Sequence, residues 1–148
     1  MSNTVSSFLT QDHRDCDDRF AALENSVASE NWIEVEKVFA SFFSDMQHHF
    51  DMEEKVMFPA FESKTGMTGG PTQMMRMEHQ QMLQILGQMK CDIEKKDKEH
   101  FFGLSETLMM LMQQHNMKEE QMLYRMADQH LGADTSLVIS QMKELERA

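Results

Sequence analysis

Two segments of the sequence combine histidine and glutamate at the same spacing. The first, HFDMEEKVMFPA, begins at His49, and the second, HNMKEEQMLYRM, begins at His115, 66 residues later. Residues four apart in an α-helix lie on one face, with Cβ atoms about 5–6 Å apart. His49 with Glu53, and His115 with Glu119, are therefore each placed to chelate one metal ion.

Two further histidines, His13 and His79, lie on the predicted apolar faces of two other helices. Four imidazoles with two carboxylates suit a divalent transition metal such as iron, zinc or manganese. Two carboxylates can bridge two cations, because each oxygen can bind one metal, and six donors then leave open coordination positions. The predicted metal ligands are His13, His49, Glu53, His79, His115 and Glu119.

A plainer interpretation exists for each part of this pattern. One HxxxE pair usually lies on a solvated helix face, and a lone His13 or His79 is more often a satisfied core histidine. The repeat, with a histidine on each of the other helices, favours a metal site, because so many buried polar groups without a metal would be costly. Glu54 and Glu120 lie about 100° further round the helix, and we expect them to be solvated. We expect surface positions for His48, His100 and His130.

The elements that carry these residues are predicted to be helices, because the apolar period is helical throughout and the chain has only six glycines and two prolines. Asn31 and Asp97 resemble N-caps, and Pro71 stands where a first helical residue should. The predicted helices cover about residues 10–28, 31–61, 71–96, 97–131 and 135–146. The helical period continues the inner face of the second and fourth helices through Val56, Ala60, Met122 and Met126.

Four long amphipathic helices with short connections predict an all-α fold, an up-down-up-down antiparallel four-helix bundle with a short C-terminal helix. The second and fourth helices are then diagonal and parallel, so the two repeated motifs can face each other across the core. A chain of 148 residues fits a single domain, residues 1–148, that needs no disulfide or other staple.

Composition excludes several classes of protein. The net charge of −11 argues against a nucleic-acid or anionic-membrane binder, since both need a basic face. No signal peptide or long apolar stretch is evident, and the two cysteines are interpreted as free thiols of a cytoplasmic protein. The 17 methionines fall mostly at helical spacing and are interpreted as core filler rather than thioether ligands. No protein partner can be identified.

The pattern resembles the hemerythrin-like, or HHE cation-binding, family. The match runs from DHRDCDDRF through HHFDMEEKVMFP and MEHQQM to QHNMKEEQMLY, nearly the whole chain. The resemblance implies a four-helix bundle with a non-haem di-iron centre, two Fe ions joined by carboxylate and oxo or hydroxo bridges. Its ligands would be the six residues named above.

The sequence departs from the oxygen-carrying hemerythrins at two positions. Their fifth histidine, four residues after the third-helix ligand, is replaced by Leu83, and their last carboxylate is an aspartate five residues after its histidine. Here Glu119 lies at four and Glu120 at five. Asp17, Glu120 or a water could supply the missing donor. The pattern is more similar to the di-iron proteins of iron–sulfur cluster repair and to other bacterial hemerythrin-like proteins.

Three functions are compatible with this pattern. The first is a di-iron protein that binds O2 or NO for sensing, scavenging or delivery. The alternative is a di-iron redox or repair enzyme, which reacts with O2, peroxide or NO or supplies iron for iron–sulfur cluster repair. The third is a metal-free or zinc-bound interaction bundle.

Overall fold

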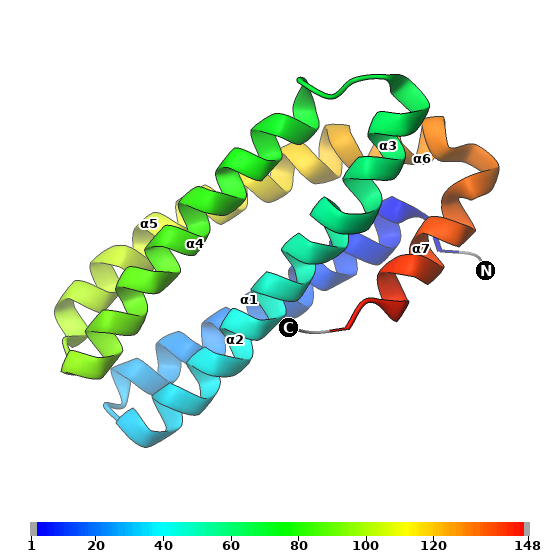
Figure 1. Cartoon of the computed structure of the whole chain (residues 1–148). Helices are drawn as coiled ribbons and strands as arrows, with labels where there is room; N and C mark the ends of the chain where they lie inside the picture. The colour runs from blue at the N-terminus through cyan, green and yellow to red at the C-terminus, as the bar shows by residue number, and fades with distance from the viewer. Residues whose placement is uncertain (1–2, 147–148) are drawn as a thin grey trace.

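The computed structural model describes residues 3–146, which are almost entirely helical and contain no strand. Figure 1 shows long helices lying side by side, with a short helix across one end. The helices are α1 (Val5–Ala28), α2 (Trp32–Met52), α3 (Phe58–Thr65), α4 (Pro71–Lys95), α5 (Lys98–Lys118), α6 (Tyr124–Leu131) and α7 (Thr135–Glu144). Between them lie two π-helical turns, η1 (Glu53–Met57) and η2 (Glu119–Leu123), and a 3-10 turn, η3 (Gly132–Asp134).

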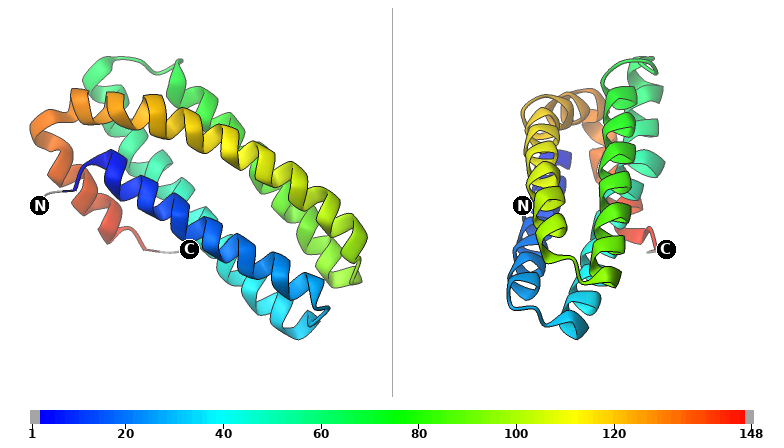
Figure 2. Two further views of the ribbon diagram at one scale, coloured as in Figure 1. Left: turned by 180° about the vertical axis from the view of Figure 1, so that it is seen from behind. Right: turned by 90° about the vertical axis from the view of Figure 1, so that its left-hand side faces the viewer.

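The long helices form two antiparallel pairs. α1 packs mainly along α2, and α4 packs mainly along α5, while α2 with α4 and α1 with α5 close the bundle. Both views of Figure 2 show the two pairs facing each other. α2, η1 and α3 form one continuous rod, as do α5, η2 and α6, and these two rods are diagonal. The predicted four-helix bundle with a C-terminal helix is confirmed.

Three of the four long helices begin at the signals predicted from the sequence. The Asn31 side chain accepts a hydrogen bond from the backbone of Glu34, and that of Asp97 does the same at its helix. Pro71 is the first residue of α4, as expected. α1 begins earlier than predicted, because Thr4 caps it and the Asp128 carboxylate accepts hydrogen bonds from the backbone N–H groups of its first turn.

The two π-helical turns change the face that each rod buries. The N–H of Phe58 donates to the carbonyl of Glu53, and that of Tyr124 donates to Glu119, five residues back instead of four. Each turn therefore holds one extra residue. The prediction of an inner position is wrong for Met122, which is 60% exposed, because the following residues rotate by one position. Val56, Ala60 and Met126 lie at the edge of the apolar core and are only partly buried. The buried residues are instead Met57, Phe58, Phe61, Leu123, Tyr124 and Ala127.

The core has two apolar clusters separated along the bundle axis. One lies toward the α1–α2 and α4–α5 connections and contains Phe42, Leu86 and Leu108. The other lies toward α3, α6 and α7 and contains Leu9 and Phe61. On every long helix the predicted metal-ligating residues fall between members of the two clusters. A buried polar layer therefore separates the two halves of the core.

The C-terminal helix covers the end of the bundle nearer this polar layer. Val138, Ile139 and Met142 of α7 are buried, and α7 contacts η1 and α1. Across residues 3–146, no helix has the combination of length and apolar character that crossing a bilayer requires.

Candidate metal centre

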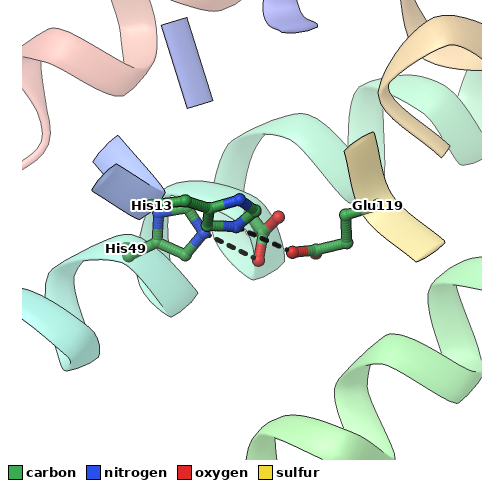
Figure 3. Close-up of side chains that lie close together, drawn as sticks. His13, His49 and Glu119 are labelled. Carbon is green, nitrogen blue, oxygen red and sulfur yellow. Dashed lines mark hydrogen bonds and ion pairs between the residues drawn. The ribbon is translucent and has the colours of Figure 1, made fainter. Parts of the chain in front are cut away.

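The structure brings all six predicted metal-ligating side chains together in the polar layer, and each is no more than 4% exposed. They form two groups of four residues. Within each group, the potential ligand atoms lie within 4.8 Å of one another. The first group is His13, His49, Glu53 and Glu119, and the second is Glu53, His79, His115 and Glu119. Figure 3 shows His13, His49 and Glu119 of the first group pointing toward one another.

The two glutamates belong to both groups. Glu53 Oε1 lies 3.0 Å from His79 Nε2 and 3.5 Å from His49 Nε2. Glu119 Oε1 lies 3.1 Å from the Nε2 atoms of both His13 and His115. Each carboxylate therefore stands between an imidazole of one group and an imidazole of the other, which is the position that a bridging ligand requires.

Every histidine in the cluster is oriented by a second carboxylate behind it. Nδ1 of each ring lies 2.6–2.7 Å from a carboxylate oxygen, which leaves Nε2 facing the centre. Ligating histidines commonly donate their other N–H to a carboxylate, which fixes the tautomer and the ring orientation. The pairs are His13 with Glu120, His49 with Asp12, His79 with Glu54, and His115 with Glu78.

This arrangement corrects one expectation and adds two residues that sequence reasoning missed. Glu54 and Glu120 are only partly exposed, and each reaches across to a histidine of another helix, so neither is simply solvated. Asp12 and Glu78 were not anticipated. Each directly precedes a predicted ligand histidine, and that shared position was the signal available in the sequence.

The centre has an internal two-fold pattern. Residues of the first two long helices correspond to residues 66 positions later: His13 to His79, His49 to His115, Glu53 to Glu119, Glu54 to Glu120, and Phe58 to Tyr124. Asp12 corresponds to Glu78 in the same way. Both π-helical turns also begin at corresponding residues. Each half of the chain thus supplies the same histidines and glutamates to the cluster, and the halves differ at Asp12 and Glu78 and at Phe58 and Tyr124.

Tyr124 was also missed, because the unbroken helical period placed Met122 and Met126 inward instead. Its side chain is fully buried, and its hydroxyl lies 2.6 Å from Glu53 Oε2 and 3.1 Å from Glu119 Oε1. The same oxygen lies 3.0 Å from His13 Nε2. The π-helical turn η2 brings this hydroxyl into the polar layer.

The carboxylates make the buried imidazoles more basic. Burial by itself would lower the pKa of His79, but the carboxylates led by Glu53 outweigh it and raise the pKa to about 9. The pKa values of His13 and His115 are raised as well, because contact with Glu119 outweighs their burial. In the absence of a cation, the raised pKa values favour protonated rings beside the buried carboxylates.

The two shared glutamates titrate differently. Burial and the neighbouring carboxylate of Glu119 raise the pKa of Glu53. Burial opposes ionisation of Glu119 too, but His115 and the other imidazoles lower its pKa well below the usual value. One of the two carboxyl groups therefore holds a proton more readily than the other, as expected for two acids that share a buried site.

Four buried polar atoms of the cluster have no hydrogen bond of acceptable geometry: Glu53 Oε1, His79 Nε2, His115 Nε2 and Glu119 Oε2. His79 Nε2 lies 3.0 Å from Glu53 Oε1, and His115 Nε2 lies 3.1 Å from Glu119 Oε1, but these contacts are not aligned as hydrogen bonds. Unpartnered buried polar atoms are unfavourable and rare. The four atoms belong to residues whose potential ligand atoms lie within 4.8 Å of one another, which fits a cation between them, since imidazole nitrogen and carboxylate oxygen are its usual donors.

The residues considered for the missing fifth donor, and the position of that donor itself, lie outside both groups. Asp17 is exposed, Glu120 is hydrogen-bonded to His13, and Leu83 is partly buried beside the first apolar cluster. The predicted surface histidines His100 and His130 are exposed, but His48 is partly buried, and its Nε2 lies 3.0 Å from the carbonyl oxygen of Leu145. Both cysteines are free thiols, as expected.

A helical bundle with a buried four-histidine, two-glutamate cluster defines a class of metal-binding protein. Comparison with protein families matches the Hemerythrin HHE cation binding domain over residues 4–127, and the chain therefore belongs to this family. Comparisons with curated proteins and with solved structures gave no match.

Proposed function

We propose that the protein is a non-haem di-iron protein whose centre binds a small diatomic ligand, O2 or NO, for sensing, scavenging or delivery. The six ligands would be the predicted ones, and one ion would occupy each four-residue group. The observation that carries this proposal is that Glu53 and Glu119 belong to both groups, which is the arrangement of two bridging carboxylates.

The residues present fit such a pair of ions. Two divalent cations would satisfy the unpartnered atoms of the second group and replace the protons on the imidazoles. When bound, an iron pair supplies redox-active sites to which a diatomic molecule can coordinate. The chain's own contribution is to hold the imidazoles through the outer carboxylates and to surround the site with apolar residues. Phe50, for example, stacks on His79 with ring centroids 4.0 Å apart.

The alternative, a redox or repair enzyme, is favoured by Leu83 in place of the fifth histidine. One ligand fewer leaves more open coordination, and hence more scope for turnover or iron release. Stopped-flow mixing of the iron-loaded protein with O2, NO and peroxide separates the two functions. Reversible adducts support ligand binding, whereas repeated turnover or loss of iron supports the enzyme.

Measurement of the iron content tests the di-iron centre on which both functions depend. Protein loaded with ferrous iron without oxygen should retain about two irons per chain, and Glu53→Ala or Glu119→Ala should retain about one or none. Glu106→Ala, which removes an exposed carboxylate of α5, is the matched control. An iron content near zero in the unmodified protein would contradict the proposal.

A further inference from the structure

The hydroxyl of Tyr124 contacts every residue of the first group. Tyr124 is the only tyrosine of the chain and is fully buried. Its hydroxyl oxygen lies 2.6 Å from Glu53 Oε2, 3.0 Å from His13 Nε2, 3.1 Å from Glu119 Oε1 and 3.5 Å from His49 Nε2. One oxygen is thus close to all four side chains of the first group.

These four distances match the spacing between neighbouring donors on one ion. Around an octahedral ion with bonds of about 2.1 Å, donors at right angles lie roughly 3.0 Å apart, and each donor has four such neighbours. The Tyr124 oxygen has four neighbours at 2.6–3.5 Å. A hydroxyl that only hydrogen-bonded to Glu53 would need one close partner, not four.

The corresponding residue at the second group is Phe58, 66 positions earlier. Phe58 stacks on His79 with ring centroids 5.9 Å apart, much as Tyr124 stacks on His13 at 5.6 Å. The two rings occupy equivalent places, but Phe58 has no oxygen to offer. The unpartnered histidine atoms, His79 Nε2 and His115 Nε2, belong to the second group, whereas Tyr124 contacts both histidines of the first group.

A small cavity also reaches the second group. Its volume is about 30 Å³, and it lies between α4 and α5 against His115, with Met82 and Gln81 among its lining residues. A water molecule needs roughly 10–15 Å³ of such space, so the cavity accommodates a ligand of two or three atoms. It borders His115 of the second group on the side of Glu78 and Lys118, and none of its lining residues belongs to the first group.

We propose that the Tyr124 oxygen is the fifth protein donor of the ion in the first group, and that exogenous ligands therefore bind at the second group, beside Phe58. This inference rests on the proposed di-iron function. Coordination of a ferric ion releases the hydroxyl proton to solvent, so that the donor is a phenolate. The two metal positions are then chemically different, although the histidines and glutamates around them are equivalent.

The first experiment examines the ferric protein by visible absorption and resonance Raman spectroscopy, with ring-deuterated tyrosine incorporated during expression. A phenolate bound to iron should give a charge-transfer band whose Raman modes shift with the label. Because the chain has one tyrosine, any such mode belongs to Tyr124. Two irons per chain without label-sensitive modes would overturn the assignment of Tyr124, whereas absence of iron would overturn the di-iron function as well.

The second experiment moves the hydroxyl. Tyr124→Phe should lose the charge-transfer band while retaining about two irons, and its azide titration should rise from one to two ligands per centre. Phe58→Tyr should add a hydroxyl at the second group and weaken azide binding at least 10-fold. The control is Phe61→Tyr, a fully buried ring one turn further on that contacts His130 instead of the cluster.

The double variant Tyr124→Phe with Phe58→Tyr distinguishes coordination from a purely structural role. It should regain the tyrosinate band and bind one azide, now at the first group. If the band and the azide stoichiometry of Tyr124→Phe equal those of the unmodified protein, Tyr124 only positions Glu53 by a hydrogen bond, and the inference is wrong.

Discussion

Each histidine of this centre depends on a carboxylate behind it. The histidines face the centre through Nε2, and their Nδ1 atoms are held by carboxylates from neighbouring helices. Replacement of such an outer carboxylate typically lowers metal affinity about 10–100-fold, because the ring loses its fixed tautomer and orientation. A residue that touches no metal can therefore matter nearly as much as a ligand.

Glu54 provides the sharpest test of these outer carboxylates. Its carboxylate lies 2.6 Å from His79 Nδ1, so Glu54→Ala should lower metal affinity about 10–100-fold. Glu54→Gln should lose less, because an amide oxygen still accepts the hydrogen bond. Lys55→Ala alters the exposed neighbour and should leave affinity unchanged. Competition with a chelator measures these affinities, and equal values for Glu54→Ala and Lys55→Ala would show that the contact is unimportant.

Leu83 lies one helical turn after His79 and replaces the histidine of the oxygen carriers. Leu83→His should place an imidazole beside the second group, fill one open position and slow the binding of azide or NO to the iron-loaded protein. The cost is apolar burial of up to about 1.5–3 kcal/mol, offset if the imidazole coordinates. Leu83→Met is the apolar control. Unchanged binding rates and visible spectrum would show that Leu83 does not border the metals.

At the scale of elements, most of the bundle could be predicted from sequence, but its two π-helical turns could not. The caps at Asn31 and Asp97 and the start at Pro71 are local signals, and they were confirmed. A π-helical turn depends on which carbonyl an N–H selects five residues back, and no local residue type specifies that choice. Tyr124 was missed for this reason.

The number of residues in η2 should fix which residues beyond it are buried. Deletion of Gln121 and Met122, both exposed, removes one residue more than the extra one, so the rod should become α-helical and the following residues should rotate by about 100°. Tyr124 would then leave the core, at about 1.5–3 kcal/mol for a large side chain lost. Deletion of Gln121 alone removes only the extra residue, keeps Tyr124 and Ala127 on the buried face, and is the control. Urea denaturation compares the two, and equal midpoints would show that the rod adapts to either deletion without loss.

At the scale of the whole molecule, the polar layer divides an otherwise apolar core. The six inner side chains were predicted from their helical spacing and are brought together as expected. The outer carboxylates were harder to foresee, because each reaches a histidine on a different helix and depends on helix–helix packing. Without a cation, contacts between imidazoles and carboxylates hold the polar layer together. Protonation of these imidazoles therefore contributes to the stability of the metal-free fold.

As the pH rises, the metal-free protein should lose stability, while the stabilisation conferred by bound metal should increase. The pKa of His79 is raised from 6.5 to about 9 in the metal-free fold, so its protonation stabilises that fold fully below pH 6.5. This stabilisation is lost as the pH rises through 9, and the raised pKa values of His13 and His115 act in the same direction. Metal ions compete with these protons, so metal affinity, and the stabilisation that binding confers, should increase over the same interval.

Urea denaturation at pH 6.5, 7.5 and 8.5, with and without metal, measures both trends. The metal-free midpoint should fall from pH 6.5 to 8.5, while the difference between loaded and metal-free midpoints should widen. His79→Gln should flatten the metal-free decline, because the replacement has no proton to lose in this range. A metal-free midpoint that rises with pH would show that the buried imidazoles are neutral in the absence of metal, and that the carboxylates beside them carry the protons instead.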